Sequence, residues 1–147
     1  MVAEFYRFEG RTLLPDGLRA PKAHSLARLA GEGKLRFVRL LGCRLLDHVD
    51  FVLIEVDVEV GQLVRHPIRP VEAIGICFDL EDRFAPEAFA FREDFPLVPH
   101  LNMREWSIPR SLCLFEVPYL DIKAQWTPAQ FVERIRTWLR LTARGEL

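Results

Sequence analysis

The stretch Phe51–Val60, which reads FVLIEVDVEV, decides the fold class. In its second half every other position is apolar, namely Ile54, Val56, Val58 and Val60. Acidic residues fill the positions between them, namely Glu55, Asp57 and Glu59. A period of two is that of a β-strand with one face on a core and one face in water. The stretch therefore predicts a half-buried strand of an antiparallel sheet.

Three further segments on either side of this strand also read as strands. They are Lys34–Asp47, which Gly42 interrupts, Glu72–Leu80 and Ala88–Arg92. The connections between the four segments are short, and consecutive strands with short connections usually pair with each other. We therefore expect a four-stranded antiparallel meander.

Helical patterns stand at both ends of the chain. Pro21–Gly31 places apolar residues at helical spacing, and Gly31 and Gly33 are stop signals. The C-terminal helix has Thr127 as N-cap, Pro128 at its first position and Gly145 as its end. Its apolar stripe consists of Phe131, Ile135, Trp138 and Leu139. The residues expected to face outward are Glu133, Arg134, Arg136 and Arg140.

Size and composition limit the possible classes of protein. The 147 residues are half hydrophobic and carry a net charge of −1, so we expect one packed domain spanning 1–147 and no general nucleic-acid binding. Three cysteines are too few, and odd in number, for a disulfide scaffold, which favours free thiols in a reducing compartment. Charges throughout residues 1–20 and the absence of a long apolar stretch predict no signal peptide, no membrane span and a cytoplasmic location.

The segment Phe95–Gln125 is the place to look for chemistry. It contains four prolines, so we expect little regular structure, and long loops in compact domains are usually functional. Cys113 lies in this segment near Arg110, which would favour its thiolate. Cys43 and Cys77 stand inside apolar strands and read as inert core thiols. Trp106 either buttresses the loop, meets a partner or packs in the core.

Other kinds of site have weaker support. The four histidines, His24, His48, His66 and His100, are scattered without metal-ligand spacing, and no glycine-rich nucleotide loop occurs. We therefore expect no metal and no cofactor. A cysteine hydrolase remains an alternative, because His100 is thirteen residues before Cys113 and its imidazole could lie near the thiol.

The order of motifs after residue 72 resembles that of ubiquitin-conjugating enzymes, and most closely that of their bacterial relatives. The motifs that carry the resemblance are Ile76–Phe78, Phe84–Pro86, Arg92–Pro96, Pro99–Asn102, Pro109–Leu114 and Trp126–Pro128. The resemblance implies an α+β fold with an N-terminal helix, the meander, a long active-site loop and a C-terminal helix. The segment Val117–Gln125 is longer than the family's spacing and is expected to form a loop of its own. Trp126 and Pro128 are expected to support the start of the helix.

The resemblance also implies a function. Cys113 matches the position of the catalytic cysteine, which receives a ubiquitin-like modifier from an adenylating activating enzyme and passes it to a lysine of a target protein. Asn102 would stabilise the oxyanion or order the loop, or serve a plain turn. Glu116 or Asp121 would orient or deprotonate the acceptor amine. A metalloprotease deconjugase, and a role in antiphage defence, accompany some such systems. A non-catalytic binding module of the same fold is the main alternative.

The basic residues are very uneven in type, with 17 Arg against only three lysines, Lys22, Lys34 and Lys123. A GC-rich genome explains this ratio simply. A protein that holds an activated thioester would also gain from few lysines, because arginine offers no attacking amine at neutral pH. Lys123, between Cys113 and Trp126, is the expected site of self-modification.

Overall fold

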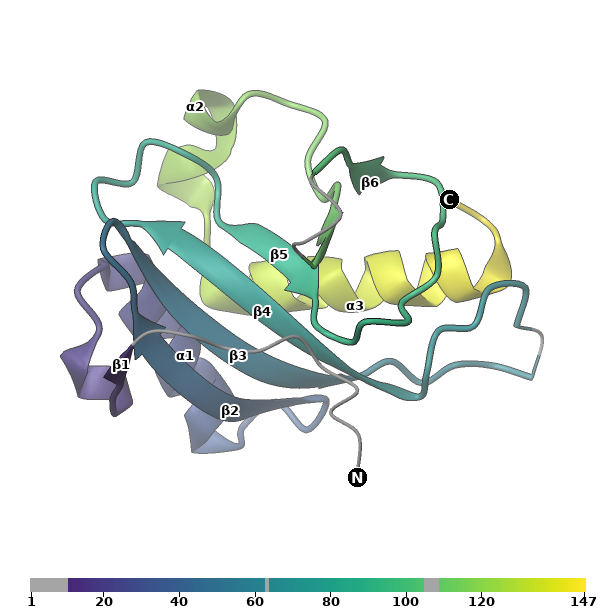
Figure 1. Cartoon of the computed structure of the whole chain (residues 1–147), viewed down its shortest axis with the longest axis horizontal. Coiled ribbons are helices and arrows are strands. Elements are labelled where there is room, and N and C mark those ends of the chain that lie inside the picture. The colour runs from purple at the N-terminus through teal and green to yellow at the C-terminus, as the bar shows by residue number, and fades with distance from the viewer. Residues whose placement is uncertain (1–10, 63, 105–108) are drawn as a thin grey trace.

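The computed structural model of the chain describes residues 11–62, 64–104 and 109–147. Within these residues seven strands form a sheet in the order β1-β2-β3-β4-β5-β7-β6, and all neighbours are antiparallel (Figure 1). The strands are β1 (Arg11–Thr12), β2 (Val38–Leu45), β3 (Val49–Asp57), β4 (Val71–Asp79), β5 (Glu87–Ala90), β6 (Leu101–Asn102) and β7 (Arg110–Leu112). Strands β2 to β5 follow one another in space as in the chain.

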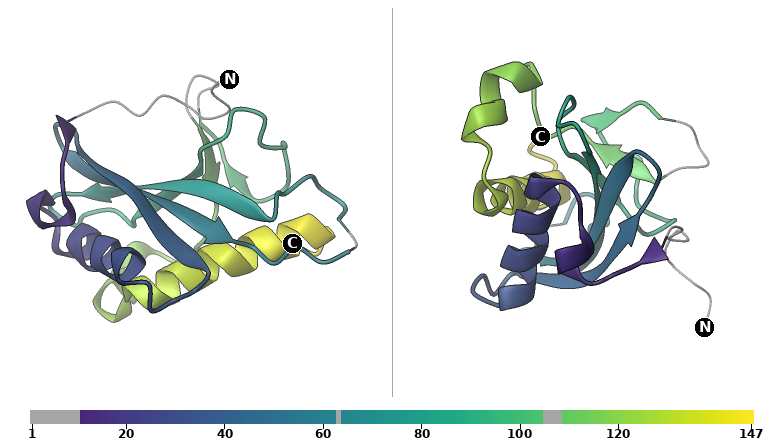
Figure 2. Two further views of the ribbon diagram at one scale, coloured as in Figure 1. Left: turned by 90° about the horizontal axis from the view of Figure 1, so that it is seen from below. Right: turned by 90° about the vertical axis from the view of Figure 1, so that its left-hand side faces the viewer.

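The two long helices, α1 (Pro21–Glu32) and α3 (Pro128–Arg144), cover the same face of the sheet (Figure 2). A short 3-10 turn, η1 (Pro15–Gly17), precedes α1. The carboxylate of Asp50 in β3 holds the start of α1, because its Oδ2 accepts the backbone N–H groups of Arg19 and Ala20, each at 2.6 Å. The fold is therefore a two-layer α+β arrangement, with the core between the helices and the sheet.

The segment Phe95–Gln125 contains more regular structure than its prolines led us to expect. It holds β6, β7, a one-turn helix α2 (Tyr119–Ile122) and a 3-10 turn η2 (Lys123–Gln125). Pro109 directly precedes β7, and Pro118 is the N-cap of α2. The prolines stand before the elements, where no backbone donor is needed, and so do not interrupt them. The prediction for Trp106 falls outside the described residues.

The apolar patterns read from the sequence face the core. Ile54, Val56 and Val58 are fully buried, although β3 ends at Asp57. The stripe of α3 is buried along its whole length, and Cys43 belongs to the same cluster. Thr127 caps α3 by accepting the Gln130 N–H at 3.2 Å. At the other end Gly145 adopts a left-handed φ of 71°, which glycine tolerates without strain.

The outward-facing arginines of α3 do more than meet solvent. Arg136 and Arg140 form ion pairs with opposite carboxylate oxygens of Glu59, at 2.8 and 3.2 Å. Arg140 Nε also donates to the carbonyl oxygen of Val58 at 3.2 Å. These contacts attach the helix to the end of β3. Helical periodicity places the residues on the outer side of the stripe, but it does not reveal which neighbouring segment their long side chains reach.

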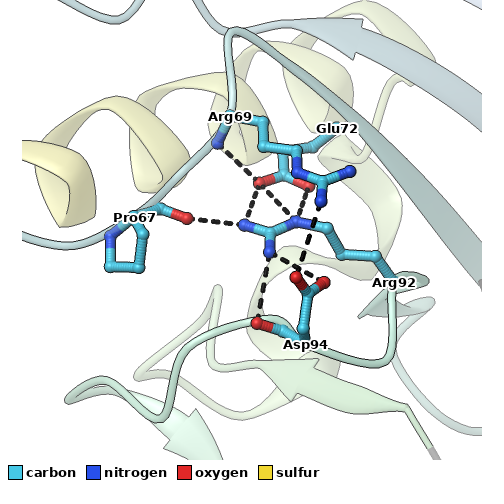
Figure 3. Close-up of polar contacts among 5 residues, drawn as sticks. All are labelled: Pro67, Arg69, Glu72, Arg92 and Asp94. Atoms are coloured by element: carbon cyan, nitrogen blue, oxygen red, sulfur yellow. Dashed lines mark hydrogen bonds and ion pairs between the residues drawn. The ribbon is translucent and has the colours of Figure 1, made fainter. Parts of the chain in front are cut away.

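A buried ion pair anchors the chain as it leaves the sheet after β5. Arg92 is 3% exposed and Glu72, in β4, is 1% exposed, and Nε and Nη2 of the guanidinium each donate to the carboxylate at 2.9 Å. Nη2 also donates to the Pro67 carbonyl, and Nη1 donates to the carbonyl and carboxylate of Asp94 (Figure 3). Burial acts to lower the pKa of Arg92, but the hydrogen bonds and charge of Glu72 and Asp94 hold it above its usual value.

This cluster gives the Arg92–Pro96 motif a structural role. Phe95, which belongs to this motif, is buried and stacks on Trp138 of α3 with ring centroids 6.4 Å apart. The motif therefore fixes the path of the chain from β5 across α3 toward β6. That path delivers residues 99–102 to the strand that precedes Cys113.

Candidate active site around Cys113

Cys113 lies immediately after β7, at the end of the sheet that β6 completes. Its backbone N–H donates to the His100 carbonyl at 3.0 Å, which extends the pairing of β6 with β7 by one residue. The side chain is half-buried, and its Sγ lies 3.9 Å from the Phe115 carbonyl oxygen. The backbone at Cys113 is therefore held on one side while the thiol reaches the surface.

The thiol lies in a groove that is lined by both apolar and polar residues. The apolar lining includes Phe84 and Val117, which are 66% and 50% exposed. The polar lining consists of Glu87, Asn102 and Arg104. The other lining residues are Ala85, Pro86, Leu112, Leu114 and Phe115. Exposed apolar side chains beside a thiol suit contact with another polypeptide.

Strand register explains why Glu87 belongs to this groove. Strand β5 pairs with β7 through Phe89 opposite Ser111 and Ala90 opposite Arg110. Glu87 stands two residues before Phe89 in β5, and Cys113 stands two residues after Ser111, directly beyond β7. Residues opposite each other in an antiparallel pair share a face of the sheet, and so do residues two apart. Glu87, Ser111 and Cys113 therefore share the face that lies away from the helices.

A chain of polar contacts runs along this face beside the thiol. Arg104 Nη2 lies 2.8 Å from Glu87 Oε2, and the same oxygen accepts the Ser111 hydroxyl at 2.5 Å. Asn102 Nδ2 then donates to Ser111 Oγ at 2.9 Å and to the Leu112 carbonyl at 3.2 Å. Both hydrogens of the Asn102 amide are thus directed at β7, and its Oδ1 can only accept. In this arrangement Asn102 joins β6 to β7 and has no hydrogen left for an oxyanion.

The other residues expected at the site, His100, Glu116 and Asp121, do not belong to the lining of the groove. His100 has an exposed side chain and a left-handed φ of 63°, and its contact with Cys113 is made by its backbone carbonyl. No hydrogen bond joins its imidazole to Cys113 within the described residues. Glu116 and Asp121 are both exposed. Asp121 lies in the first turn of α2.

Sequence reasoning missed four residues that shape the site. Glu87, Arg104 and Ser111 belong to the polar chain, and the only signal for them was the strand register, which requires β7 to be known. The fourth is Arg134 of α3, whose Nη1 donates to the Leu114 carbonyl at 3.0 Å. Its guanidinium also lies 4.7 Å from the centroid of the Phe115 ring. Arg134 therefore holds the segment that follows Cys113 against the helix.

The other two cysteines are poorly suited to act as nucleophiles. Burial raises the pKa of the Cys43 thiol. Burial, and next the charge of Glu87, raise the pKa of Cys77 to about 12. Cys77 packs with Phe51, Ala73 and Phe91 on the outer face of the sheet. A thiol with that pKa is ionised in about one molecule in ten thousand at pH 8.

The segment Val117–Gln125 is held against the start of α1. Lys22 Nζ lies 2.8 Å from Asp82 Oδ2, contacts the Tyr119 hydroxyl and donates to the Lys123 carbonyl at 3.2 Å. Tyr119 in turn donates to Asp82 Oδ1 at 2.5 Å, and burial followed by this contact raises its pKa. Trp126 packs on Phe78 and Phe131 in the core. The segment was expected to form a loop of its own, but it consists mostly of the helical turns α2 and η2, which have defined attachments.

The described part of the chain contains no group of three or more His, Cys, Asp or Glu residues arranged to hold a metal ion. Among its helices, none combines the length and the apolar character needed to cross a membrane.

Comparison with known proteins gives one family. The model of a family described as Prokaryotic E2 family A matches residues 46–147, which include β3 to β7, the groove and α3. Comparisons with curated proteins and with solved structures gave no match.

Proposed function

The chain belongs to Prokaryotic E2 family A, and we propose that it transfers a ubiquitin-like modifier from an activating enzyme to an acceptor amine through a thioester on Cys113. The observation that carries this proposal is the place of Cys113: a half-buried thiol in a groove whose lining includes exposed apolar side chains. Family membership suggests conjugation, and the groove supports Cys113 as the residue that performs it.

The reaction would proceed in two acyl transfers. In the first, the Cys113 thiolate attacks the thioester carbonyl of the charged activating enzyme, a new C–S bond forms, and the activating enzyme's cysteine leaves as thiolate. In the second, an acceptor amine attacks the thioester on Cys113, the C–N bond forms and the Cys113 thiolate leaves. The ammonium form of the acceptor loses two protons in all: one returns to the Cys113 thiolate and one goes to solvent. A thiolate is a good leaving group, so the protein mainly needs to position the reactants.

Asn102 and the backbone would share the task of shaping this site. With both Nδ2 hydrogens directed at β7, Asn102 acts as the loop-ordering residue. The oxyanion is then assigned to backbone amides next to Cys113. Arg134 supports the same segment through the Leu114 carbonyl.

The partners follow from the reaction. A ubiquitin-like modifier would occupy the groove with its C-terminal tail, against Phe84 and Val117. An adenylating activating enzyme would supply the charged modifier, and a lysine of a target protein would accept it. The system would also include a metalloprotease that removes the modifier.

The test is a charging reaction with the activating enzyme and modifier encoded beside this protein, together with ATP. Non-reducing electrophoresis should reveal an adduct that thiol removes. We expect the adduct to disappear in Cys113→Ala and to persist in Cys77→Ala, the matched control on the same face of the sheet. Absence of any adduct when the activating enzyme is itself charged would overturn the proposal.

The two alternatives are distinguished by the same reagents. A non-catalytic binding module would bind the modifier without forming the adduct. A cysteine hydrolase would cleave a small ester without an activating enzyme, and this activity would depend on His100. The exposed imidazole and the backbone role of His100 argue against that second alternative.

A further inference from the structure

We propose that Glu87 is the group that recognises the acceptor ammonium beside Cys113, and that Arg104 occupies this cation site until the acceptor arrives. The inference rests on the proposed thioester transfer and names its acceptor class, a primary ammonium such as that of a lysine side chain. The acceptor contact is thereby assigned to Glu87, which lines the same groove as the thiol, and not to Glu116 or Asp121.

Glu87 lies close to Cys113 in the folded chain. Glu87 and Cys113 line the same groove, and the Glu87 carboxylate accepts the hydroxyl of Ser111, which stands two residues before Cys113. The carboxylate is thus anchored to a rigid strand next to the thiol. Exposed carboxylates on the segment after Cys113 have no such fixed relation to it.

The Glu87 carboxylate can accept a further hydrogen-bond donor. Both described polar partners of the Glu87 carboxylate, the Ser111 hydroxyl and the Arg104 guanidinium, contact Oε2. Within the described residues Oε1 receives no hydrogen bond, and Glu87 is 27% exposed. A carboxylate has about four acceptor positions, so this one can bind another cation. Ser111 meanwhile fixes its orientation.

One cation, the guanidinium of Arg104, already contacts the Glu87 carboxylate. Arg104 is 42% exposed and reaches Glu87 from the segment after β6, so its guanidinium lies among the polar lining residues of the groove. A partly exposed ion pair of this kind contributes little to stability, so an incoming ammonium can displace it. Arg104 therefore occupies one side of the carboxylate and competes with the acceptor for its charge.

The role of Glu87 in the second acyl transfer is positional. It holds the ammonium near the thioester carbon, and after one proton leaves to solvent the neutral amine attacks. The C–N bond forms, the C–S bond breaks, and the second amine proton goes to the Cys113 thiolate. Glu87 begins and ends as a carboxylate, so no further reactant is required.

The test uses a chemically charged form of the whole chain. A synthetic peptide ending in Gly-Gly, supplied as its mercaptoethanesulfonate thioester, should acylate Cys113 by thiol exchange, and intact-mass measurement follows the adduct. Excess peptide is removed, and discharge is timed with two acceptors near neutral pH. Nα-acetyllysine presents an ammonium, whereas hydroxylamine is mainly neutral at that pH and has no need of a counter-charge.

We expect Glu87→Gln to slow discharge to Nα-acetyllysine by about ten- to a hundredfold, the range for losing a charge-assisted hydrogen bond, and to leave discharge to hydroxylamine unchanged. Arg104→Gln should discharge to Nα-acetyllysine faster than wild type, because it removes the cation that competes for Glu87. A purely structural role of the ion pair would slow both variants with both acceptors, and that result would overturn the proposal. Glu133→Gln on α3 is the matched control for the substitution itself.

The remaining outcomes distinguish failure of the proposed thioester transfer from failure of the acceptor role of Glu87. If the wild-type chain cannot be acylated at Cys113, the proposed function itself fails. If Cys113 is acylated and Glu87→Gln discharges to Nα-acetyllysine at the wild-type rate, only the present inference fails. A selective loss in Glu116→Gln or Asp121→Asn would likewise overturn it and assign the acceptor contact to the segment after Cys113.

Discussion

Two arginine–glutamate pairs of the same chemistry lie in contrasting environments in this molecule. Arg92 and Glu72 are 3% and 1% exposed, whereas Arg104 and Glu87 are 42% and 27% exposed. The first pair anchors the chain between β5 and α3. The second lies in the groove that contains Cys113.

The two pairs differ in how many of their charged atoms have hydrogen-bond partners. The guanidinium of Arg92 directs all three of its nitrogens at acceptors from Glu72, Pro67 and Asp94 (Figure 3). Glu72 also accepts the backbone N–H of Arg69 at 2.9 Å. Among the described residues, the partners of Glu87 contact only one of its two oxygens. A fully partnered buried pair holds a structure together, while a partly partnered and accessible pair can exchange one partner for a ligand.

The largest expected effect is on the buried pair. Glu72→Gln leaves the buried Arg92 charge with only the exposed carboxylate of Asp94 as counter-charge and should lower the free energy of unfolding by about 3–5 kcal/mol. Urea denaturation followed by far-UV circular dichroism measures this change. The double variant Glu72→Leu with Arg92→Met should lose less than the single variant, because no unpaired charge remains. A single variant as stable as wild type would break the comparison.

Arg134 provides an intermediate case, since its partners are a neutral carbonyl and an aromatic ring. Arg134→Ala removes the contact with the Leu114 carbonyl and the packing on Phe115, and should lower the free energy of unfolding by about 1 kcal/mol. The same variant should charge Cys113 more slowly, because the segment after the thiol is less well held. Arg144→Ala, at the end of the same helix, is the control and should not affect charging.

The pair beside Cys113 should contribute little to stability. Glu87→Gln is expected to change the free energy of unfolding by less than about 1 kcal/mol, because the ion pair is partly exposed and glutamine can still accept from Ser111. Urea denaturation in parallel with Glu72→Gln measures the contrast directly. A loss from Glu87→Gln as large as that from Glu72→Gln would show that the groove pair is also structural.

The smallest expected effect concerns the exposed edge of the buried cluster. The hydrogen bond from Arg92 holds the pKa of Asp94 below its usual range against the opposing effect of burial, and the charges of Arg92 and Arg69 add to the lowering. Ionised Asp94 therefore stabilises the fold above about pH 4, and this contribution is lost as the pH falls through its lowered pKa. Asp94→Asn should be slightly less stable than wild type at neutral pH.

Measuring the free energy of unfolding as the pH is lowered tests the same contribution of Asp94. The difference between wild type and Asp94→Asn should shrink as the pH falls below about 4, because Asp94 becomes protonated in the wild-type protein. A difference that stays constant with pH would show that the Arg92–Asp94 contact is not electrostatic in origin.

The three lysines illustrate how local contacts qualify a compositional argument. Lys22 Nζ is engaged with Asp82 and Tyr119, and Lys34 forms an exposed ion pair with Glu32 at 3.5 Å. Lys123 contributes its backbone carbonyl to the attachment of Val117–Gln125. Self-modification at Lys123 stays a prediction, and mass spectrometry of the charged protein checks it. Modifier found on Lys22 or Lys34 alone would refute it.

Much of the fold was predictable because it depends on local rules. The alternation after Ile54 predicted β3, and Thr127 with Gly145 predicted the ends of α3, since caps and periodicity act within a few residues. The short strands β6 and β7 were not predicted. Each has two or three residues, too few for a period, and they form because the Arg92 cluster brings residues 101–102 to residues 111–112.

The sequence by itself determined the fold class and identified Cys113 as the candidate nucleophile, because periodicity, capping and the order of motifs are properties of the chain. Tertiary structure alone decided which charges accompany that thiol. Glu87 stands 26 residues before Cys113 in the sequence and becomes its neighbour only through the pairing of β5 with β7. Glu116 is three residues from Cys113 and yet lies outside the groove. Side-chain neighbours across a sheet are set by strand register, which links residues far apart in sequence.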